Sequence, residues 1–424
     1  MDVFDAQYIP MKSLFSREGT EIEVAYKPDG QPWYVYVVDQ LLTVDRDDNI
    51  ERLRRTLPGL RAAERDELGD LGERPVPGDL VVLSIDALEE GRLTVPEALD
   101  LLDERLGDDN PALHGGDPIA TAVYVMHTSK LCAASEPAVP CGSPPQPCPP
   151  PSSAEESRYD VRLGVCDTGL LLDLNLGWCP WLIGVEGEED PLGRVLPGGL
   201  RSIPYDAGHG TFVAGVARCV APGATVYVGN HFTKSGGELE YVIVAKLEEL
   251  IATQSPHVVN LSAGTYTRKN WPLLSFSDFL RRHGDIPLVA AAGNDSTDEQ
   301  FWPAAFPSTV AVGALGADWQ NLAYFSNYGS WVDVYAPGEG LVNAFATGVY
   351  TYQEPPKRPT RQVFEGVARW DGTSFSAPEV AGLIAAEMSR TGADAQTATQ
   401  AVLALAQSQA ISGVGPALFP PDAG

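Results

Sequence analysis

The chain is poor in basic residues. Its 424 residues include 29 Lys and Arg against 57 Asp and Glu, which gives a net charge of −28. Nucleic acids and anionic membranes attract basic surfaces, so this balance argues against both kinds of partner. The acidity favours solubility, and a preference for cationic substrates is an open alternative.

Long apolar runs are also absent. A membrane-spanning helix needs about 18 consecutive apolar residues without charges, and no stretch of this sequence comes close to that length. Residues 1–10 contain early acidic residues and lack the basic and then apolar pattern of an export signal. We therefore expect a cytoplasmic protein without membrane contact, or a secreted one if a signal has been removed.

Cysteines are few and scattered. The six of them are Cys132, Cys141, Cys148, Cys166, Cys179 and Cys219. They form no compact disulfide framework, and no spacing of Cys and His is typical of a metal site. Cys166 ends an apolar run, where a small apolar filler is a better interpretation than a reactive thiol.

Proline is concentrated in residues 134–158, which have no apolar periodicity. Such a segment is extended and cannot form a core, so it separates an N-terminal domain, 1–133, from a larger domain, 159–424. The patterns in the smaller domain indicate an α+β or α/β fold. Its predicted strands are 33–38, 80–85 and 119–126, and its predicted helices are 49–57 and 95–106.

The larger domain alternates predicted strands with predicted helices. The strands are 161–166, 225–229, 257–261, 287–292 and 309–314, and the helices are 209–219, 238–252, 274–283 and 376–390. This alternation predicts an α/β fold in which a parallel sheet is covered on both faces. A functional site is then expected along the carboxyl edge of the sheet. Residues 347–370 are expected to form a hairpin or loop at its rim.

Three side chains in this domain suggest acyl-transfer chemistry. Ser374 lies between a glycine turn and the start of a helix rich in small residues. A serine is a weak nucleophile unless a base and a group that orients the base accompany it. His209, between two glycines, is the candidate base, and Asp167, directly after an apolar strand, is the candidate orienting carboxylate.

The order aspartate, histidine, serine is one of the known orders for this catalytic geometry. Two further segments, 260–264 and 290–294, lie between His209 and Ser374. With these segments, residues from about 158 to 424 resemble the subtilisin-like serine peptidases, the subtilases. The resemblance implies a subtilisin-like sheet and a catalytic triad that needs no cofactor. Structural calcium is common in that family and remains an open expectation, although no loop here has a specific calcium pattern.

The resemblance also assigns binding roles. Asn294 is expected to donate to the oxyanion, beside the backbone N–H of Ser374. Extended peptides are expected to lie along main chain on two sides of a cleft. The residues expected to bind substrate are Ser262, Ala263 and Gly264 on one side, Ser235, Gly236 and Gly237 on the other, and Gly293. Phe301 is expected at the base of the primary pocket, where its ring would favour small or medium side chains.

The sequence therefore predicts a serine endopeptidase that works through an acyl-enzyme on peptide or protein substrates. One alternative is a dedicated maturation or defence peptidase for one cellular partner, recognised by the N-terminal domain. Another is a peptidase-like module that binds peptides without catalysis. The N-terminal domain itself is either a propeptide that blocks the site or a docking and regulatory module.

Overall fold

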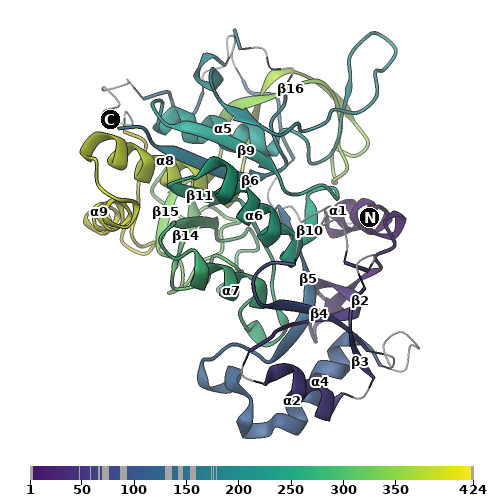
Figure 1. Cartoon of the computed structure of the whole chain (residues 1–424). Helices are drawn as coiled ribbons and strands as arrows, with labels where there is room; N and C mark the ends of the chain where they lie inside the picture. The colour runs from purple at the N-terminus through teal and green to yellow at the C-terminus, as the bar shows by residue number, and fades with distance from the viewer. Residues whose placement is uncertain are drawn as a thin grey trace.

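The computed structural model contains two packed units (Figure 1). The described residues are 3–46, 48–57, 59–64, 67–68, 76–85, 93–128, 136–141, 147–152, 159–172, 174, 176–177 and 179–421. In Figure 1 the N-terminal unit is purple to blue, and the larger unit runs from teal to yellow. We call the unit before residue 129 the N-unit and the unit from residue 159 the peptidase unit.

A seven-stranded parallel sheet forms the centre of the peptidase unit, with the order β15-β14-β13-β11-β6-β9-β7. Its strands are β6 (Arg162–Asp167), β7 (Glu186–Gly187), β9 (Thr225–Asn230), β11 (Val258–Leu261), β13 (Leu288–Ala291), β14 (Thr309–Leu315) and β15 (Val334–Pro337). Most of these strands are buried along their length. Burial on both faces explains why their sequences are continuous apolar runs.

Helices cover both faces of this sheet, as predicted. Val165 points to the core shared with α5 (His209–Val220) and α8 (Thr373–Thr391). Its neighbour Cys166 points to the core shared with α6 (Glu240–Gln254) and α7 (Leu274–Arg282). Successive residues of a strand face opposite ways, so one apolar run serves two cores.

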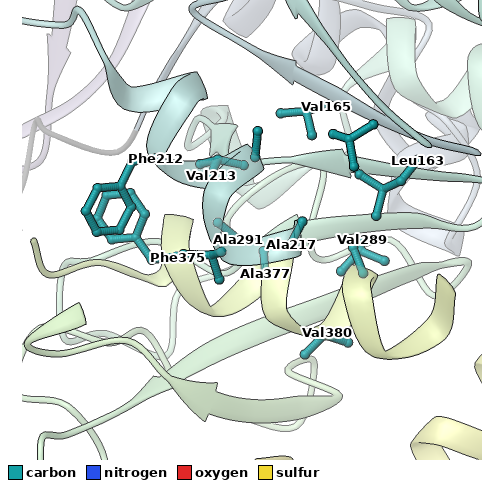
Figure 2. Close-up of a cluster of buried hydrophobic side chains, with 14 of the residues drawn as sticks. Leu163, Val165, Phe212, Val213, Ala217, Val289, Ala291, Phe375, Ala377 and Val380 are labelled. Carbon is teal, nitrogen blue, oxygen red and sulfur yellow. The ribbon is translucent and has the colours of Figure 1, made fainter. Parts of the chain in front are cut away.

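The two helices α5 and α8 pack against each other on one face of the sheet (Figure 2). Gly382 of α8 allows this close approach, because a Cβ there would come within 3.1 Å of the Ala217 carbonyl oxygen of α5. Near the beginnings of the helices, the rings of Phe212 and Phe375 lie side by side with centroids 4.5 Å apart. The first residues of α5 and α8 are therefore held next to each other.

The N-unit has an α+β fold built on an antiparallel sheet with the order β5-β2-β4-β3, and β1 pairs with β2. Its elements are α1 (Val3–Arg17), β1 (Ile22–Tyr26), β2 (Pro32–Val44), α2 (Asn49–Thr56), β3 (Leu60–Ala62), β4 (Leu80–Ile85), α4 (Val95–Leu106) and β5 (Ala120–Thr128). From β2 onward, strands and helices follow the split βαβ order of ferredoxin-like folds. Helix α1 and the short strands β1 and β3 were not predicted from the sequence.

The N-unit and the peptidase unit share continuous apolar cores. Met11 of α1 and Val123 and Val125 of β5 belong to the same buried cluster as Leu239 and Val242 of the peptidase unit. Ion pairs join the units around this core, among them Lys234 with Glu18 at 3.0 Å and Arg268 with Asp103 at 2.6 Å. Burial of apolar surface is the main stabilising term in such an interface.

A third sheet has the order β17-β16-β8, from β8 (Ser202–Ile203), β16 (Leu341–Thr351) and β17 (Arg361–Trp370). Strands β16 and β17 make a long hairpin directly before α8, where a hairpin or loop was expected. The described parts of the proline-rich segment lie on this hairpin, since Ala138 bridges to Arg369 and Cys148 to Val342. At these two described positions the segment therefore pairs with the hairpin of the peptidase unit.

Helix α9 (Ala395–Ser408), which the sequence analysis did not predict, packs on α8 near the C-terminus. Its N-terminus is capped by Asp394, whose carboxylate accepts from the Thr397 N–H at 2.8 Å. Of the helices that the structure describes, none is both long and apolar enough to cross a membrane.

Candidate active site

An aspartate and a histidine are joined at the carboxyl edge of the parallel sheet. Asp167 is the last residue of β6, and His209 is the first residue of α5. The Asp167 Oδ1 and His209 Nδ1 atoms are 2.7 Å apart, and both residues are at most 2% exposed. The Thr168 N–H also donates to Asp167 Oδ1, at 2.8 Å. A buried carboxylate therefore fixes the orientation of the imidazole.

Ser374 lies in the first turn of α8, the helix that packs against α5. The ring of its neighbour Phe375 has its centroid 5.3 Å from that of His209. The Ser374 hydroxyl donates to the carbonyl oxygen of Ser262 at 3.4 Å, and the Ser262 hydroxyl donates to the carbonyl oxygen of Ser374 at 2.8 Å. The three predicted catalytic residues thus come from β6, α5 and α8, which meet at one edge of the sheet.

Asn294 follows β13 and contacts Thr373, the first residue of α8. Its side-chain oxygen accepts from the backbone N–H and from the hydroxyl of Thr373, both at 2.9 Å. The Thr373 hydroxyl in turn accepts from the Gly293 N–H at 3.2 Å. Because the amide oxygen is held by Thr373, the NH2 group is the part of this side chain that can donate elsewhere.

A buried carboxylate that the sequence analysis missed connects the two catalytic segments. Asp190 Oδ2 accepts from the Gly208 N–H at 2.7 Å and from the Thr168 hydroxyl at 3.1 Å. The Thr168 hydroxyl accepts from the Gly210 N–H, also at 3.1 Å. Burial raises the pKa of Asp190 to about 8, and the hydrogen bonds from Gly208 and Thr168, which lower it, offset only part of this effect. Asp190 follows several other acidic residues, so no local sequence signal distinguishes it.

An aromatic side chain that was also missed covers the imidazole. The Trp370 ring stands edge-on to the His209 ring, at 5.5 Å between centroids and 89° between planes. It also packs against Phe375 at 5.2 Å. Trp370 ends β17, so the hairpin directly supports the histidine.

The two predicted peptide-binding segments lie on either side of one strand. Gly237 in β10 (Gly237–Leu239) and Gly264 in β12 (Ala263–Gly264) both pair antiparallel with His127 of β5. The Thr128 N–H donates to the carbonyl oxygen of Gly236 at 2.9 Å. Ser235, the first of the predicted residues on the β10 side, is 8% exposed. The strand between β10 and β12 thus belongs to the N-unit of the same chain.

Phe301 fills the space between Gly264 and Gly293. Its ring is 1% exposed, and a Cβ at Gly264 would overlap it. A Cβ at Gly293 would come within 3.1 Å of the same ring. Two further rings, those of Tyr266 at 5.1 Å and His127 at 6.1 Å, surround it.

No metal site emerges from the described part of the chain, where no group of three or more His, Cys, Asp or Glu could hold an ion. Cys166 is fully buried, and burial raises the pKa of its thiol well above the ordinary value. This environment suits an apolar filler and not a reactive thiolate. Cys132 lies outside the described residues.

The comparisons with known proteins identify the family. The family model described as "Subtilase family" matches residues 197–413, just over half of the chain. The chain belongs to the subtilase family. The matched range contains His209, Asn294 and Ser374, and Asp167 precedes it.

Among curated relatives, the subtilase "Thermophilic serine proteinase" of Bacillus sp. (strain AK1) is 32% identical over 42% of this chain and 41% of its own length. "Subtilisin-like protease CPC735_003880" of Coccidioides posadasii is 33% identical over 54% of this chain and 52% of its own length. The chain thus spans about half the length of the curated relatives it matches.

A solved structure extends the likeness to the N-unit. Fervidolysin from Fervidobacterium pennivorans, described as a keratinolytic enzyme related to subtilisin, superposes with a TM-score of 0.54. It is 17% identical and covers 91% of this chain and 60% of its own. At this identity the comparison concerns the fold alone. A coverage of 91% must include most of the N-unit, so both units have a counterpart there.

Proposed function

We propose that this chain is a serine endopeptidase that hydrolyses peptide bonds in peptide or protein substrates. The observation that carries the proposal is the buried pair of Asp167 and His209, 2.7 Å apart, beside the first turn of α8 with Ser374. Ser374 attacks the scissile carbonyl, and His209 accepts its proton and later gives it to the leaving amine. Asp167 holds the imidazole and stabilises its cation.

Two donors are assigned to the oxyanion that forms in this step. The Asn294 amide is oriented by Thr373, which binds its oxygen. The backbone N–H of Ser374 is the second donor. Donors that are already fixed in place stabilise the developing charge without reorganisation.

The N-unit acts as an inhibitory propeptide in this proposal. Its strand β5 occupies the place between β10 and β12 where a substrate would form the same antiparallel pairs. This observation favours a propeptide over a docking module. Residues 129–135, which follow β5, lie outside the described residues, and we expect the enzyme to cut its own chain among them.

The preferred substrate has a small or medium side chain before the cut. This proposal rests on Phe301, which is buried between Gly264 and Gly293 and leaves little room there. Specificity for one cellular partner, the narrower alternative, would appear as cleavage of that partner together with failure to cleave casein.

A fluorophosphonate label tests the catalytic assignment. Wild type should be labelled at Ser374 and should shorten on incubation, as read by intact mass. Ser374→Ala should stay unlabelled and at full length. Ser376→Ala is a matched control, because Ser376 lies in the same helix but donates to the Pro337 carbonyl oxygen at 3.1 Å. Hydrolysis or labelling retained by Ser374→Ala would refute the triad. A wild type that stays both unlabelled and at full length would favour a non-catalytic binding module.

We further propose that the reaction needs no metal or cofactor. Labelling after dialysis against EDTA should then proceed at an unchanged rate. Structural calcium would instead appear as a rise in Tm on adding calcium, because a bound ion stabilises the folded state. A loss of labelling that only a metal restores, without any change in folding, would contradict this proposal.

A further inference from the structure

A carboxylate from the proline-rich segment is buried in the β16–β17 hairpin. Glu136 is 3% exposed, and its Oε1 accepts from the Gln353 N–H at 2.7 Å and from the Tyr350 hydroxyl at 3.2 Å. Its Oε2 accepts from the Glu354 N–H at 3.4 Å. These donors come from the end of β16 and the turn that follows it, and all of them are uncharged.

The arrangement of these donors is that of an anion site. Consecutive backbone N–H groups that point the same way form a concavity that binds anions. Burying a charge without such donors would cost far more than burying a neutral polar group. Burial and the charge of Glu136 raise the pKa of Tyr350 well above its ordinary value, so its hydroxyl keeps the proton that it donates. The neighbouring Glu354 carboxylate is turned to another donor, the Tyr205 hydroxyl, at 2.6 Å.

The residues after Glu136 are bound as an extended peptide. The Tyr352 hydroxyl donates to the carbonyl oxygen of Pro137 at 3.0 Å. Ala138 and Arg369 exchange both backbone hydrogen bonds, at 2.8 and 2.7 Å. The hairpin therefore recognises an acidic side chain and, two residues later, one β-type backbone pair.

We propose that the β16–β17 hairpin carries a binding site for a peptide carboxylate, which Glu136 of the same chain fills. The site holds residues 136–138 on the peptidase unit when the chain is cut upstream of them. This second part rests on the proposed function, whereas the first part does not. Further along the segment, Cys148 pairs with Val342 and the Ser152 N–H donates to the Cys219 carbonyl oxygen at 2.6 Å.

The site is connected to the catalytic histidine by packed rings. Tyr350 contacts Phe364 at 6.1 Å between centroids, and Phe364 contacts Phe345 at 4.9 Å. Phe345 contacts Trp370 at 5.6 Å, and Trp370 contacts His209 at 5.5 Å. An empty carboxylate site should therefore loosen the hairpin that supports the imidazole.

Chemical rescue tests the carboxylate site without any need for activity. In full-length Ser374→Ala protein, Glu136→Ala should lower the Tm by about 3 °C or more, because buried donors lose their acceptor. Acetate should restore a large part of this loss, and chloride at the same ionic strength should not. Glu365→Ala, an exposed glutamate of β17, is the matched control and should change the Tm by less than about 1 °C.

Two results would overturn the proposal. One is a Glu136→Ala protein as stable as the Glu365→Ala control, and the other is an equal response to acetate and chloride. Should Glu136→Ala fail to fold, Tyr350→Phe removes one hydroxyl, which donates to Glu136 and also lies 3.3 Å from the Tyr205 carbonyl oxygen, and it should lower the Tm by a smaller amount. An unchanged Tm for Tyr350→Phe would then count against the site.

The active protein tests the second part of the proposal. After wild type has cut itself, limited proteolysis should leave residues 136–141 attached, whereas Glu136→Ala should lose them at least about tenfold faster, as for a locally opened segment. Equal rates for the two proteins would refute the retained segment. If no cut occurs at all, the proposed peptidase function fails, while acetate rescue of the inactive protein still decides the carboxylate site.

Discussion

The buried carboxylate of Glu240 accepts a hydrogen bond from the backbone N–H of Tyr124 at 3.0 Å. Glu240 begins α6 of the peptidase unit, and Tyr124 lies in the middle of β5. The hydroxyl of Ser275 donates to the same carboxylate. Burial raises the pKa of Glu240 from its ordinary 4.5 to about 7, so this contact between the two units depends on pH.

Glu240→Gln should flatten the pH dependence of stability. The folded state favours the protonated form of Glu240, because its pKa is about 7 there and 4.5 ordinarily. The stabilisation of the fold by this protonation is complete below about pH 4.5 and is lost as the pH rises through about 7. The loss amounts to about 3 kcal/mol at most. Urea unfolding of full-length Ser374→Ala protein, with and without Glu240→Gln, measures it at about pH 5 and about pH 8. An equal change in the free energy of unfolding between these two pH values for both proteins would contradict the role of Glu240.

Asp190→Ala should slow catalysis without weakening substrate binding. The substitution leaves the Gly208 N–H and the Thr168 hydroxyl without a buried acceptor, at a cost of about 1 to 3 kcal/mol each. The segments that carry Asp167 and His209 then lose their common support, and kcat should fall by about tenfold or more, with KM nearly unchanged. Asp190→Asn keeps an acceptor oxygen and should recover most of the rate. A loss confined to Tm, with normal kcat, would reduce Asp190 to a structural residue.

Phe301→Ala should enlarge the primary pocket. With the ring removed from between Gly264 and Gly293, the ratio of kcat/KM for substrates with an aromatic over a small residue before the cut should rise about tenfold or more. Phe276→Ala removes a similarly buried ring from α7 and controls for lost stability. An unchanged ratio would mean that Phe301 does not limit the pocket.

Asn294→Ala should lower kcat with little change in KM, since the amide acts on charge that appears only in the transition state. The expected fall is about 10² to 10³, the size found for such a donor in subtilisin. Thr373→Val removes one of the two donors that orient the amide and should have a smaller effect in the same direction. Normal turnover in Asn294→Ala would exclude it from the oxyanion site.

Local sequence patterns predict the peptidase unit well because its strands are buried on both faces and its helices contain small residues at close contacts. They predict β6 at 161–166 and α7 at 274–283, and the structure has Arg162–Asp167 and Leu274–Arg282. The residues assigned to the triad could be named because each lies in a short motif at the end of a strand or the start of a helix.

Other features depend on contacts that no local pattern records. Helix α1 contains Pro10 and has a weak apolar face, yet Met11 and Phe15 become fully buried because another unit covers them. Asp190 is held by the Thr168 hydroxyl and the Gly208 N–H, which only the fold brings to it. The insertion of β5 between β10 and β12 joins segments more than 100 residues apart, and only the fold brings them together.

The apolar cores shared by the two units have a consequence for activation. Breaking the chain after β5 removes one covalent connection but none of the contacts of Met11, Val123 or Val125. The nicked product should therefore migrate as one particle in gel filtration and as two bands after denaturation. If the N-unit is the propeptide proposed above, onset of activity would follow the dissociation half-life of the severed unit, and a second digestion of that unit would be the faster route to an open cleft.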